Sequence, residues 1–223
     1  MSEQHAGGDG RPQRGTMSAA DWDDRYRQGR QWSVEPNRFV VAQLEETPVP
    51  AGRALDLGSG EGRNAVWLAE QGWDVIGVDV SSVATERGRE IADELGVSVD
   101  LRVGDVVSIE TDLADVRGDG WDLVLVSYLH LPADQRRRLL AAVRWALAPN
   151  GTFLLVGHDL RNLRDGWGGP SDPDVLWSPK EVAVEFSPGR YRIDAAGVVE
   201  REVETELGTR IALDTLVRIR STR

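Results

Sequence analysis

The sequence predicts an α/β fold with a doubly wound sheet of seven strands, mostly parallel, that ends in an antiparallel hairpin. Two observations predict it. Short apolar runs alternate with helical segments over residues 53–157, and this alternation is typical of βαβ crossovers between parallel strands. Two strand-like runs, 191–203 and 210–220, follow with only a turn near 206–209 between them. Because no helix fits there, these two runs should pair as a hairpin at the sheet edge.

The first half of the chain alternates helices with apolar strands. Two helices are expected first, over 19–28 and 36–46, with Pro36 in the first turn of the second one. Gly72 and Gly96 should close two further helices, because glycine readily adopts the left-handed conformation that ends a helix. After the first two helices, the expected order is a strand over 53–57, a helix over 63–71, a strand over 74–79, a helix over 82–95 and a strand over 97–103. Gly72 and Gly96 close the two helices of this series.

The second half adds two strands, one helix and a long connection before the hairpin. A strongly apolar strand is expected over 121–127, then a helix over 133–147 that Pro149 helps to stop, and then a strand over 152–157. Residues 158–178 are rich in Gly, Asp and Pro and show no periodicity. A structureless loop of that length in a compact domain is usually functional, so we expect it to form a lid.

Length and composition favour one soluble domain. The 223 residues suit a single domain over 17–223 preceded by a flexible tail over 1–16, which has no apolar stretch. Hydrophobic residues make up 40% and charged residues 28% of the chain, as in globular proteins. There is no cysteine, which excludes disulfides, zinc–thiolate sites and a cysteine nucleophile, and no metal site is expected.

The net charge of −11 bears on partners and location. A protein that neutralises phosphates needs a basic face, so an acidic chain argues against a nucleic-acid substrate. The one basic run, residues 136–138, lies in an expected helix and is interpreted as a solvated helix face. No apolar run reaches the ~18 residues that a membrane helix requires. We therefore expect a cytoplasmic protein, monomeric or homodimeric, without a membrane partner.

A glycine-rich loop is the strongest functional signal. Gly58, Gly60 and Gly62 follow the strand over 53–57 and open the next helix, where a ligand can approach the backbone closely. Their spacing is G-x-G-x-G, whereas the dinucleotide fingerprint is G-x-G-x-x-G. Asp56 and Glu61 would repel a pyrophosphate but suit a cofactor that carries an ammonium and a sulfonium group.

Two further carboxylates follow the next strands. Asp79 lies 21 residues after Gly58, where a carboxylate can accept hydrogen bonds from both ribose hydroxyls. The alternative is that Asp79 only caps the helix beginning near Ser82. Asp105 could accept a hydrogen bond from an adenine amino group, with the Val106 amide beside it. The alternative is an ordinary turn aspartate.

These features together resemble the class I methyltransferases that depend on S-adenosyl-L-methionine (SAM). The resemblance rests on the run 55–62, on Asp79, on Gly104-Asp105 and on the terminal hairpin, and it spans roughly residues 18–220. It implies a Rossmann-like fold, SAM as the cofactor and methyl transfer as the reaction.

One branch of that family is more similar than the rest. The run 60–65 (Gly-Glu-Gly-Arg-Asn-Ala) and the segment 22–26 resemble the tellurite-resistance and thiopurine methyltransferase-like branch, although that branch usually has cysteine at the position of Ser59. There the amino-terminal segment folds over the cofactor, which implies contacts to SAM from Tyr26, Arg30 and Trp32. The residues expected to bind SAM are Asp56, Gly58, Ser59, Gly60, Arg63, Asn64, Asp79, Val80, Asp105, Val106, Ser127, Tyr26 and Trp32.

Two histidines are candidates for catalysis. Methyl transfer from a sulfonium is an in-line displacement, so alignment supplies much of the acceleration. Thiolates need little more, whereas phenols, amines and carbon acids need a base. His130 and His158 follow the fourth and fifth strands, at the sheet edge where ligands bind, and Asp159 could orient its neighbour. The alternative is that both histidines only pack beneath the adjoining loops. His5 lies in the tail and is set aside.

The sequence thus predicts a SAM-dependent methyltransferase that acts on a small molecule. Heterocyclic or aromatic thiols, phenols and metalloid oxyanions all remain open as acceptors, and Tyr128, Trp167 and Trp177 are expected to line an aromatic pocket. A SAM-binding sensor or scaffold without catalysis is the alternative from another class. An NAD-dependent oxidoreductase is disfavoured by the glycine spacing and by the terminal hairpin.

Overall fold

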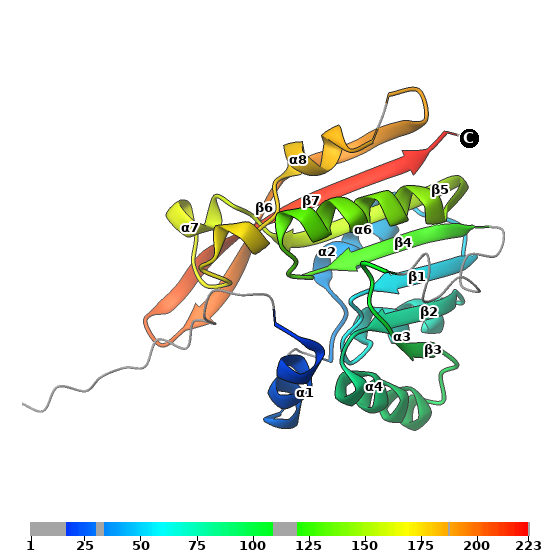
Figure 1. The fold of residues 1–223 in the computed structure, drawn as a ribbon, viewed down its shortest axis with the longest axis horizontal. Coiled ribbons are helices and arrows are strands. Elements are labelled where there is room, and N and C mark those ends of the chain that lie inside the picture. Colours follow the sequence, from blue (N-terminus) through cyan, green and yellow to red (C-terminus); the bar gives the residue numbers. More distant parts are fainter. Residues whose placement is uncertain (1–16, 30–33, 109–119, 187, 223) are drawn as a thin grey trace, which may run out of the picture.

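Seven strands form one sheet in the part of the chain that the computed structural model describes, which is residues 17–29, 34–108, 120–186 and 188–222 (Figure 1). Their order is β3-β2-β1-β4-β5-β7-β6, and β7 pairs antiparallel with both β5 and β6, whereas the other pairs are parallel. The predicted fold class is therefore confirmed. The strands are β1 Arg53–Leu57, β2 Asp74–Asp79, β3 Asp100–Val103, β4 Trp121–Ser127, β5 Leu147–His158, β6 Tyr191–Thr205 and β7 Gly208–Ser221.

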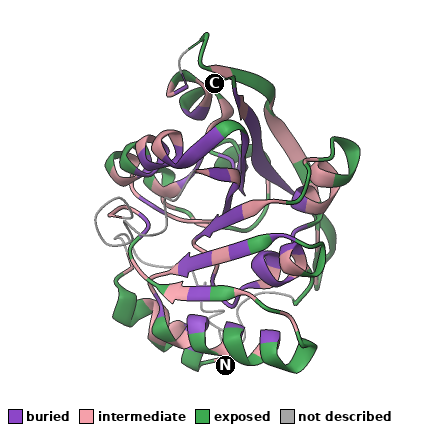
Figure 2. Cartoon of the chain, turned by 90° about the vertical axis from the view of Figure 1, so that its right-hand side faces the viewer, coloured by how far each residue is buried: buried purple, intermediate pink, exposed green. Residues whose placement is uncertain are grey.

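Helices cover both faces of the sheet, because alternate residues of the central strands point to opposite sides. Leu123 and Leu125 of β4 pack in one core cluster with α2 and α3, whereas Val124 and Val126 pack in the other with α6 and α8. Figure 2 shows the sheet centre buried and the outer helix faces exposed. The helices are α1 Ala19–Arg27, α2 Arg38–Glu46, α3 Arg63–Glu70, α4 Ser82–Leu95, α6 Ala133–Ala146, α7 Asn162–Asp165 and α8 Pro179–Val184.

Several boundaries differ from the sequence prediction, most of them by one or two residues, and three of the differences need comment. Pro36 lies before α2 rather than in its first turn, because Asn37 is the N-cap and its side chain accepts hydrogen bonds from two amides of that turn. Strand β3 begins at Asp100, three residues later than predicted. Strand β5 begins at Leu147, five residues early, because Leu147 pairs with Trp121 and the strand then bulges before the regular register resumes.

The segment 158–178 was predicted to be structureless. It instead contains α7 and the short 3₁₀ helix η2 Pro173–Val175. Its two ends are tied together: the Trp177 amide donates to the His158 carbonyl (2.9 Å). Trp177 is 1% exposed and its indole Nε1 donates to the Leu129 carbonyl (3.0 Å), so it belongs to the core rather than to an aromatic pocket. Trp167 is half exposed, with Arg210 over its ring, and it is not among the residues that line the cavity described below. Whether the segment moves as a lid stays a prediction.

The basic run 136–138 was predicted to be a solvated helix face, and only part of it is solvated. Arg137 and Arg138 are exposed, but Arg136 is buried. Its guanidinium donates to the carbonyls of Leu131 and Asp174 and lies over the Trp177 ring. Through these contacts Arg136 holds the segment 158–178 against α6.

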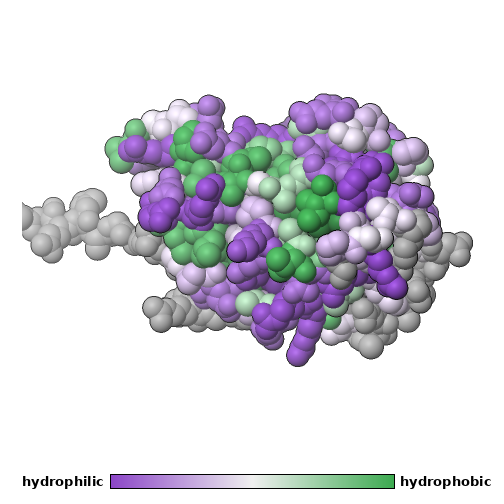
Figure 3. All heavy atoms as spheres, turned by 90° about the horizontal axis from the view of Figure 1, so that it is seen from above, coloured by the Kyte–Doolittle hydropathy of each residue, from purple (hydrophilic) through white to green (hydrophobic). Residues whose placement is uncertain are grey.

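No helix within the described ranges is long and apolar enough to cross a lipid bilayer. The face seen from above shows several hydrophobic patches separated by hydrophilic residues (Figure 3). The predicted tail, residues 1–16, lies outside the described residues.

Candidate functional site

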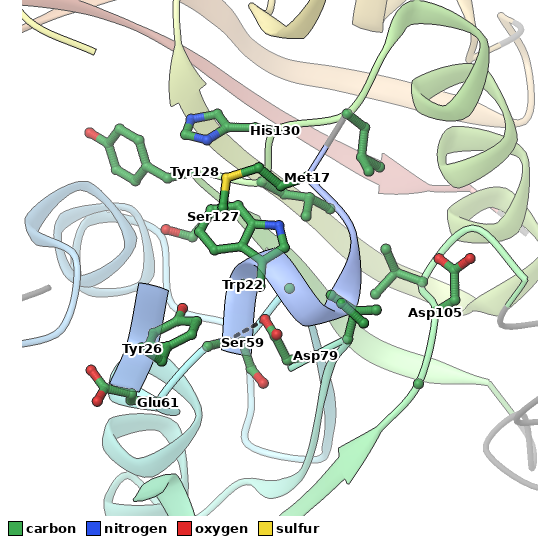
Figure 4. Close-up of a pocket in the computed structure, with 18 of the residues that line it drawn as sticks. Met17, Trp22, Tyr26, Ser59, Glu61, Asp79, Asp105, Ser127, Tyr128 and His130 are labelled. Carbon is green, nitrogen blue, oxygen red and sulfur yellow. Dashed lines mark hydrogen bonds between the residues drawn. The ribbon is translucent and has the colours of Figure 1, made fainter. Parts of the chain in front are cut away.

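A cavity of about 280 Å³ lies at the carboxyl ends of the parallel strands (Figure 4). The strand order reverses there, between β1 and β4, which is where open α/β sheets bind their ligands. The glycine loop after β1 and the ends of β2, β3 and β4 form its floor, and α1 lies across it. It is lined by Met17, Ser18, Ala19, Trp22, Tyr26, Gly58, Ser59, Gly60, Glu61, Arg63, Asn64, Asp79, Val80, Gly104, Asp105, Val106, Ser127, Tyr128, Leu129, His130, Leu131 and Gln135.

Most residues selected from the sequence meet in this cavity. The ones on its lining are Tyr26, Gly58, Ser59, Gly60, Arg63, Asn64, Asp79, Val80, Asp105, Val106 and Ser127, together with the catalytic candidate His130. Asp56 is fully buried below the lining, and burial raises its pKa to about 7. Trp32 and Arg30 lie outside the described residues. His158 is not on the lining but stacks on His130, with 5.5 Å between ring centroids.

Asp79 anchors the floor of the cavity. Its Oδ2 accepts a hydrogen bond from the Gly60 amide (2.8 Å) and its Oδ1 one from the Ser81 amide (2.9 Å). The N-cap of α4 is Ser81, whose hydroxyl accepts from the Ala84 amide, so Asp79 does not cap that helix. Burial raises the pKa of Asp79. Because a carboxylate has about four lone-pair sites, Asp79 can still accept two hydrogen bonds from a ligand.

The glycine loop folds against β2 and contacts α1. The amides of Gly58 and Ser59 both donate to the Val78 carbonyl (2.8 and 3.1 Å). Gly60 has a φ of +56°, and a Cβ placed on it would lie 2.7 Å from the Tyr26 hydroxyl. Tyr26 is 3% exposed, and Figure 4 shows its ring beside the loop and Glu61. Only glycine allows this approach of the loop to α1.

Helix α1 is fixed over the cavity by polar contacts that the sequence analysis missed. Asp23 accepts hydrogen bonds from the Ser81 hydroxyl (2.6 Å) and the Val83 amide (3.1 Å) at the start of α4. Arg87 of α4 donates to the Tyr26 carbonyl. The start of α1 does have a local sequence signal, because Ser18 and Asp21 form a capping box. The docking itself joins residues about sixty positions apart and has no local signature.

Other polar residues of the cavity differ in whether their side chains already have hydrogen-bond partners in the protein. Asp105 accepts from the Val107 amide (2.9 Å), as an ordinary turn aspartate does, and it also lines the cavity, so its contact with an adenine stays a prediction. The Asn64 amide oxygen accepts from the Asn37 amide (2.8 Å) and so holds the start of α2. Ser127 is buried, and among the described residues its hydroxyl has no hydrogen-bond partner.

A second group of ionisable side chains lies next to the cavity, beyond β4. We call it the Asp214 cluster: Tyr128, His158, Arg201 and Asp214. Asp214 is fully buried in β7, and its Oδ2 accepts from the Tyr128 hydroxyl (2.5 Å) and from Arg201 Nε (2.7 Å). Its Oδ1 lies 3.3 Å from His158 Nδ1. Burial raises the pKa of Asp214, but the contacts with its three neighbours outweigh burial and hold that pKa below its usual value.

The cluster corrects one prediction about the histidines. Asp159 does not orient His158, because its two oxygens accept from the Arg161 amide (2.8 Å) and the Thr215 hydroxyl (2.7 Å). Consecutive residues of an extended strand point to opposite sides, so the two side chains diverge. Asp214 occupies the position that was predicted for Asp159. The sequence offered one signal for it: a single acid in the apolar run 211–217.

His130 has an environment that keeps it neutral. Burial, followed by the nearby charges of His158 and Arg25, lowers its pKa to about 3. Its Nε2 is buried without a hydrogen-bond partner among the described residues. At neutral pH His130 therefore offers the cavity an uncharged ring.

Comparisons with known proteins agree with this geometry. Residues 54–151 match a family model described as a methyltransferase domain. Among curated proteins, 2-heptyl-1-hydroxyquinolin-4(1H)-one methyltransferase of Mycobacteroides abscessus is 24% identical over 178 residues, 74% of each chain. A ribosomal protein L11 methyltransferase of Syntrophotalea carbinolica is 31% identical over 119 residues, 53% of this chain. The chain spans only 36% of that relative and 32% of a ribosomal RNA methyltransferase of Alcanivorax borkumensis.

Solved structures share the fold. The structure titled "Conversion of a Disulfide Bond into a Thioacetal Group during Echinomycin Biosynthesis" has a TM-score of 0.71 at 22% identity and covers 91% of this chain and 92% of its own. TehB from Haemophilus influenzae has a TM-score of 0.67 at 15% identity, covering 91% and 67%. The family match thus covers residues 54–151, the solved structures share the fold, and these similarities support SAM as the cofactor of that methyltransferase domain.

Proposed function

We propose that this chain transfers the methyl group of SAM to a small-molecule acceptor. The observation that carries the proposal is the cavity floor, where a buried carboxylate, Asp79, is held by the Gly60 amide at the switch point of the sheet. Two further hydrogen bonds could be accepted there from a ribose diol, which supports the proposal. Glu61, which lines the cavity beside it, suits a cofactor that carries positive charge rather than a pyrophosphate.

Each part of SAM has suitable groups on the lining. Asp79 would accept hydrogen bonds from the ribose hydroxyls, and Asp105 with the Val106 amide would hold the adenine edge. Arg63, in the first turn of α3, would pair with the amino-acid carboxylate. The unpartnered hydroxyl of Ser127 is a further polar group that a ligand would satisfy. Bound SAM supplies a methyl group on a sulfonium, which is already a good electrophile, so the chain's task is alignment and, for protic acceptors, proton removal.

A small acceptor fits the molecule better than a nucleic acid. The net charge is −11, and α1 lies across the cavity. Relatives differ in what their names report: one acts on a hydroxyquinolone, others on ribosomal protein L11 or RNA. We infer that a hydroxyl on an aromatic ring is the first acceptor class to test. Aromatic thiols and metalloid oxyanions, which the similarity to the tellurite-resistance branch suggests, come next.

A turnover panel tests this proposal. The full chain would be incubated with SAM and, separately, 1-hydroxyquinolin-4(1H)-one, 4-methylphenol, thiophenol, selenite and transfer RNA. Mass spectrometry of products would detect a gained methyl group, and formation of S-adenosylhomocysteine would measure the rate. We expect turnover with a small molecule and none with RNA. SAM binding without turnover of any small molecule would favour a sensor or scaffold instead.

The loop glycine provides a prediction with a matched control. Gly60→Ala should weaken SAM binding by at least about tenfold, or about 1.4 kcal/mol, because its Cβ would displace the Tyr26 hydroxyl. Gly72→Ala carries the same penalty of a positive φ (+87°), but no atom lies within 4 Å of its Cβ. Both variants should lose similar thermal stability, and only the first should lose affinity in calorimetry. Equal SAM affinity in the two variants would contradict the placement of the cofactor.

A further inference from the structure

The Asp214 cluster holds a charge that the fold alone does not need. Asp214 is fully buried in β7, in a run that is otherwise mostly apolar. Burying an ionised carboxylate is costly unless it is paired and hydrogen-bonded. Here the pairing requires side chains from three other strands or strand ends: Tyr128 after β4, His158 at the end of β5 and Arg201 in β6. Such a cluster at the ligand-binding edge is a functional-site candidate.

The contacts fix the orientation of the His158 ring. Nδ1 lies 3.3 Å from Asp214 Oδ1, within ion-pair distance but without hydrogen-bond geometry, and Nε2 lies on the opposite side of the ring. The ring lies against Tyr128 edge-on at 4.9 Å between centroids and stacks on His130 at 5.5 Å. Tyr128 and His130 line the cavity, so His158 stands directly behind its β4 side. His158 itself is 7% exposed and is not part of that lining.

Two backbone features support a built site at this position. Tyr128 has a φ of +54°, a left-handed conformation that is strained for a tyrosine, and its amide donates to the Val156 carbonyl (2.8 Å). Strain of this kind gathers at functional sites. Gly169 of the segment 158–178 covers the ring from another side, because a Cβ on it would lie 3.0 Å from His158 Nδ1.

We propose that His158 is the general base of the methyl transfer, that Asp214 is its positioning residue, and that the acceptor is an oxygen or nitrogen acid. This inference rests on the proposed function. The acceptor's O–H or N–H proton passes to Nε2 of His158, while the freed electron pair forms the bond to the methyl carbon. The bond from that carbon to sulfur breaks, and S-adenosylhomocysteine remains. Asp214 stabilises the imidazolium until it gives its proton to water.

His130 is the competing base, and its surroundings argue against it. Its pKa is lowered to about 3, chiefly by burial, and a base that weak removes a proton from a phenol poorly. Its ring carries no contact with a carboxylate among the described residues. His130 instead contributes an uncharged wall to the cavity.

The decisive experiment is the pH profile of kcat/KM for 4-methylphenol in the unchanged chain and in Asp214→Asn. The titratable or charged groups that face His158 are Asp214 from β7, Tyr128 and His130 after β4, and Arg201 from β6. Burial, followed by Asp214, raises the pKa of Tyr128, so that phenol stays neutral. In Asp214→Asn no carboxylate favours the imidazolium. The plateau of the profile should then fall by at least about tenfold.

Controls separate positioning from stability. Affinity for S-adenosylhomocysteine, measured by calorimetry, should change by less than about twofold in Asp214→Asn, and turnover of thiophenol should be nearly unchanged. Asp214→Glu should restore part of the plateau. Equal losses with phenol and thiol would overturn the inference, as would turnover of thiophenol alone by the unchanged chain. Absence of S-adenosylhomocysteine binding in the unchanged chain would instead refute the proposed function.

A second pair of variants serves if Asp214→Asn does not fold. Gly169→Ala presses a methyl group against the His158 ring, whereas Gly168→Ala, with a similar φ of +72°, has no atom within 4 Å of its Cβ. We expect kcat for 4-methylphenol to fall by about tenfold in the first and to stay unchanged in the second. Equal kcat in the two variants would overturn the role of His158.

Discussion

Replacing His158 with alanine should lower kcat for 4-methylphenol by ~10²–10⁴-fold, the range for removal of a general base. The affinity for SAM should stay nearly intact, because His158 does not line the cofactor cavity. With thiophenol the loss should be small, since that thiol is ionised near neutral pH and its own pKa then governs the rate. Steady-state kinetics with both acceptors across pH would measure the difference.

The matched control for this variant is His130→Ala. His130 stacks on His158 and lines the cavity, but its lowered pKa makes it a poor base. We expect a loss of only severalfold with either acceptor. A large loss with the thiol and none with the phenol, in either variant, would contradict the base assignment altogether.

Replacing Asp79 with alanine should weaken SAM binding by roughly 1.5–3 kcal/mol, the scale of hydrogen bonds to a charged group. Two causes act together: the ribose hydroxyls lose their acceptor, and the Gly60 and Ser81 amides lose the carboxylate that holds the loop. Calorimetric titration with S-adenosylhomocysteine would measure the change. Asp74→Ala is the control, because Asp74 is an exposed carboxylate at the opposite end of the same strand. An unchanged dissociation constant in Asp79→Ala would remove the ribose assignment.

That the glycine loop, Asp79, Asp105 and Ser127 would meet in one cavity was predictable, because their sequence signals are local. Strand β1, the glycine loop and α3 follow one another within about twenty residues, and Asp79 ends the next strand. Parallel pairing of β1 with β2 then brings Asp79 to Gly60 without further information. The same holds for Asp105 at the end of β3 and Ser127 at the end of β4.

The Asp214 cluster depends on contacts between distant parts of the chain. The sequence analysis selected Asp159 as the partner of His158, because it is adjacent in the sequence. The antiparallel register of β5 with β7 instead places Asp214 opposite His158, 56 residues away. Arg201 reaches Asp214 only because β6 pairs with β7. No periodicity or spacing encodes that register.

Contacts between distant residues also explain two predictions that were wrong, the start of β5 and the place of Trp177. Pro149 and Asn150 have the signature of a helix stop and a loop, yet β5 runs through them, because Leu147 already pairs with Trp121. Trp177 lies in a stretch rich in polar residues and Gly, but packing beside Leu129 and Arg136 buries it. A long connection can therefore contribute to the core when both of its ends are fixed.

The most direct test of the central claim is a calorimetric titration of the full chain with SAM and, separately, with NAD. The loop spacing, the acidic floor and Asp79 predict one SAM bound per chain and no heat of binding with NAD. S-adenosylhomocysteine should compete for the same site. Binding of NAD in place of SAM, or binding of neither, would contradict the assignment of this cavity to a methyl-transfer cofactor.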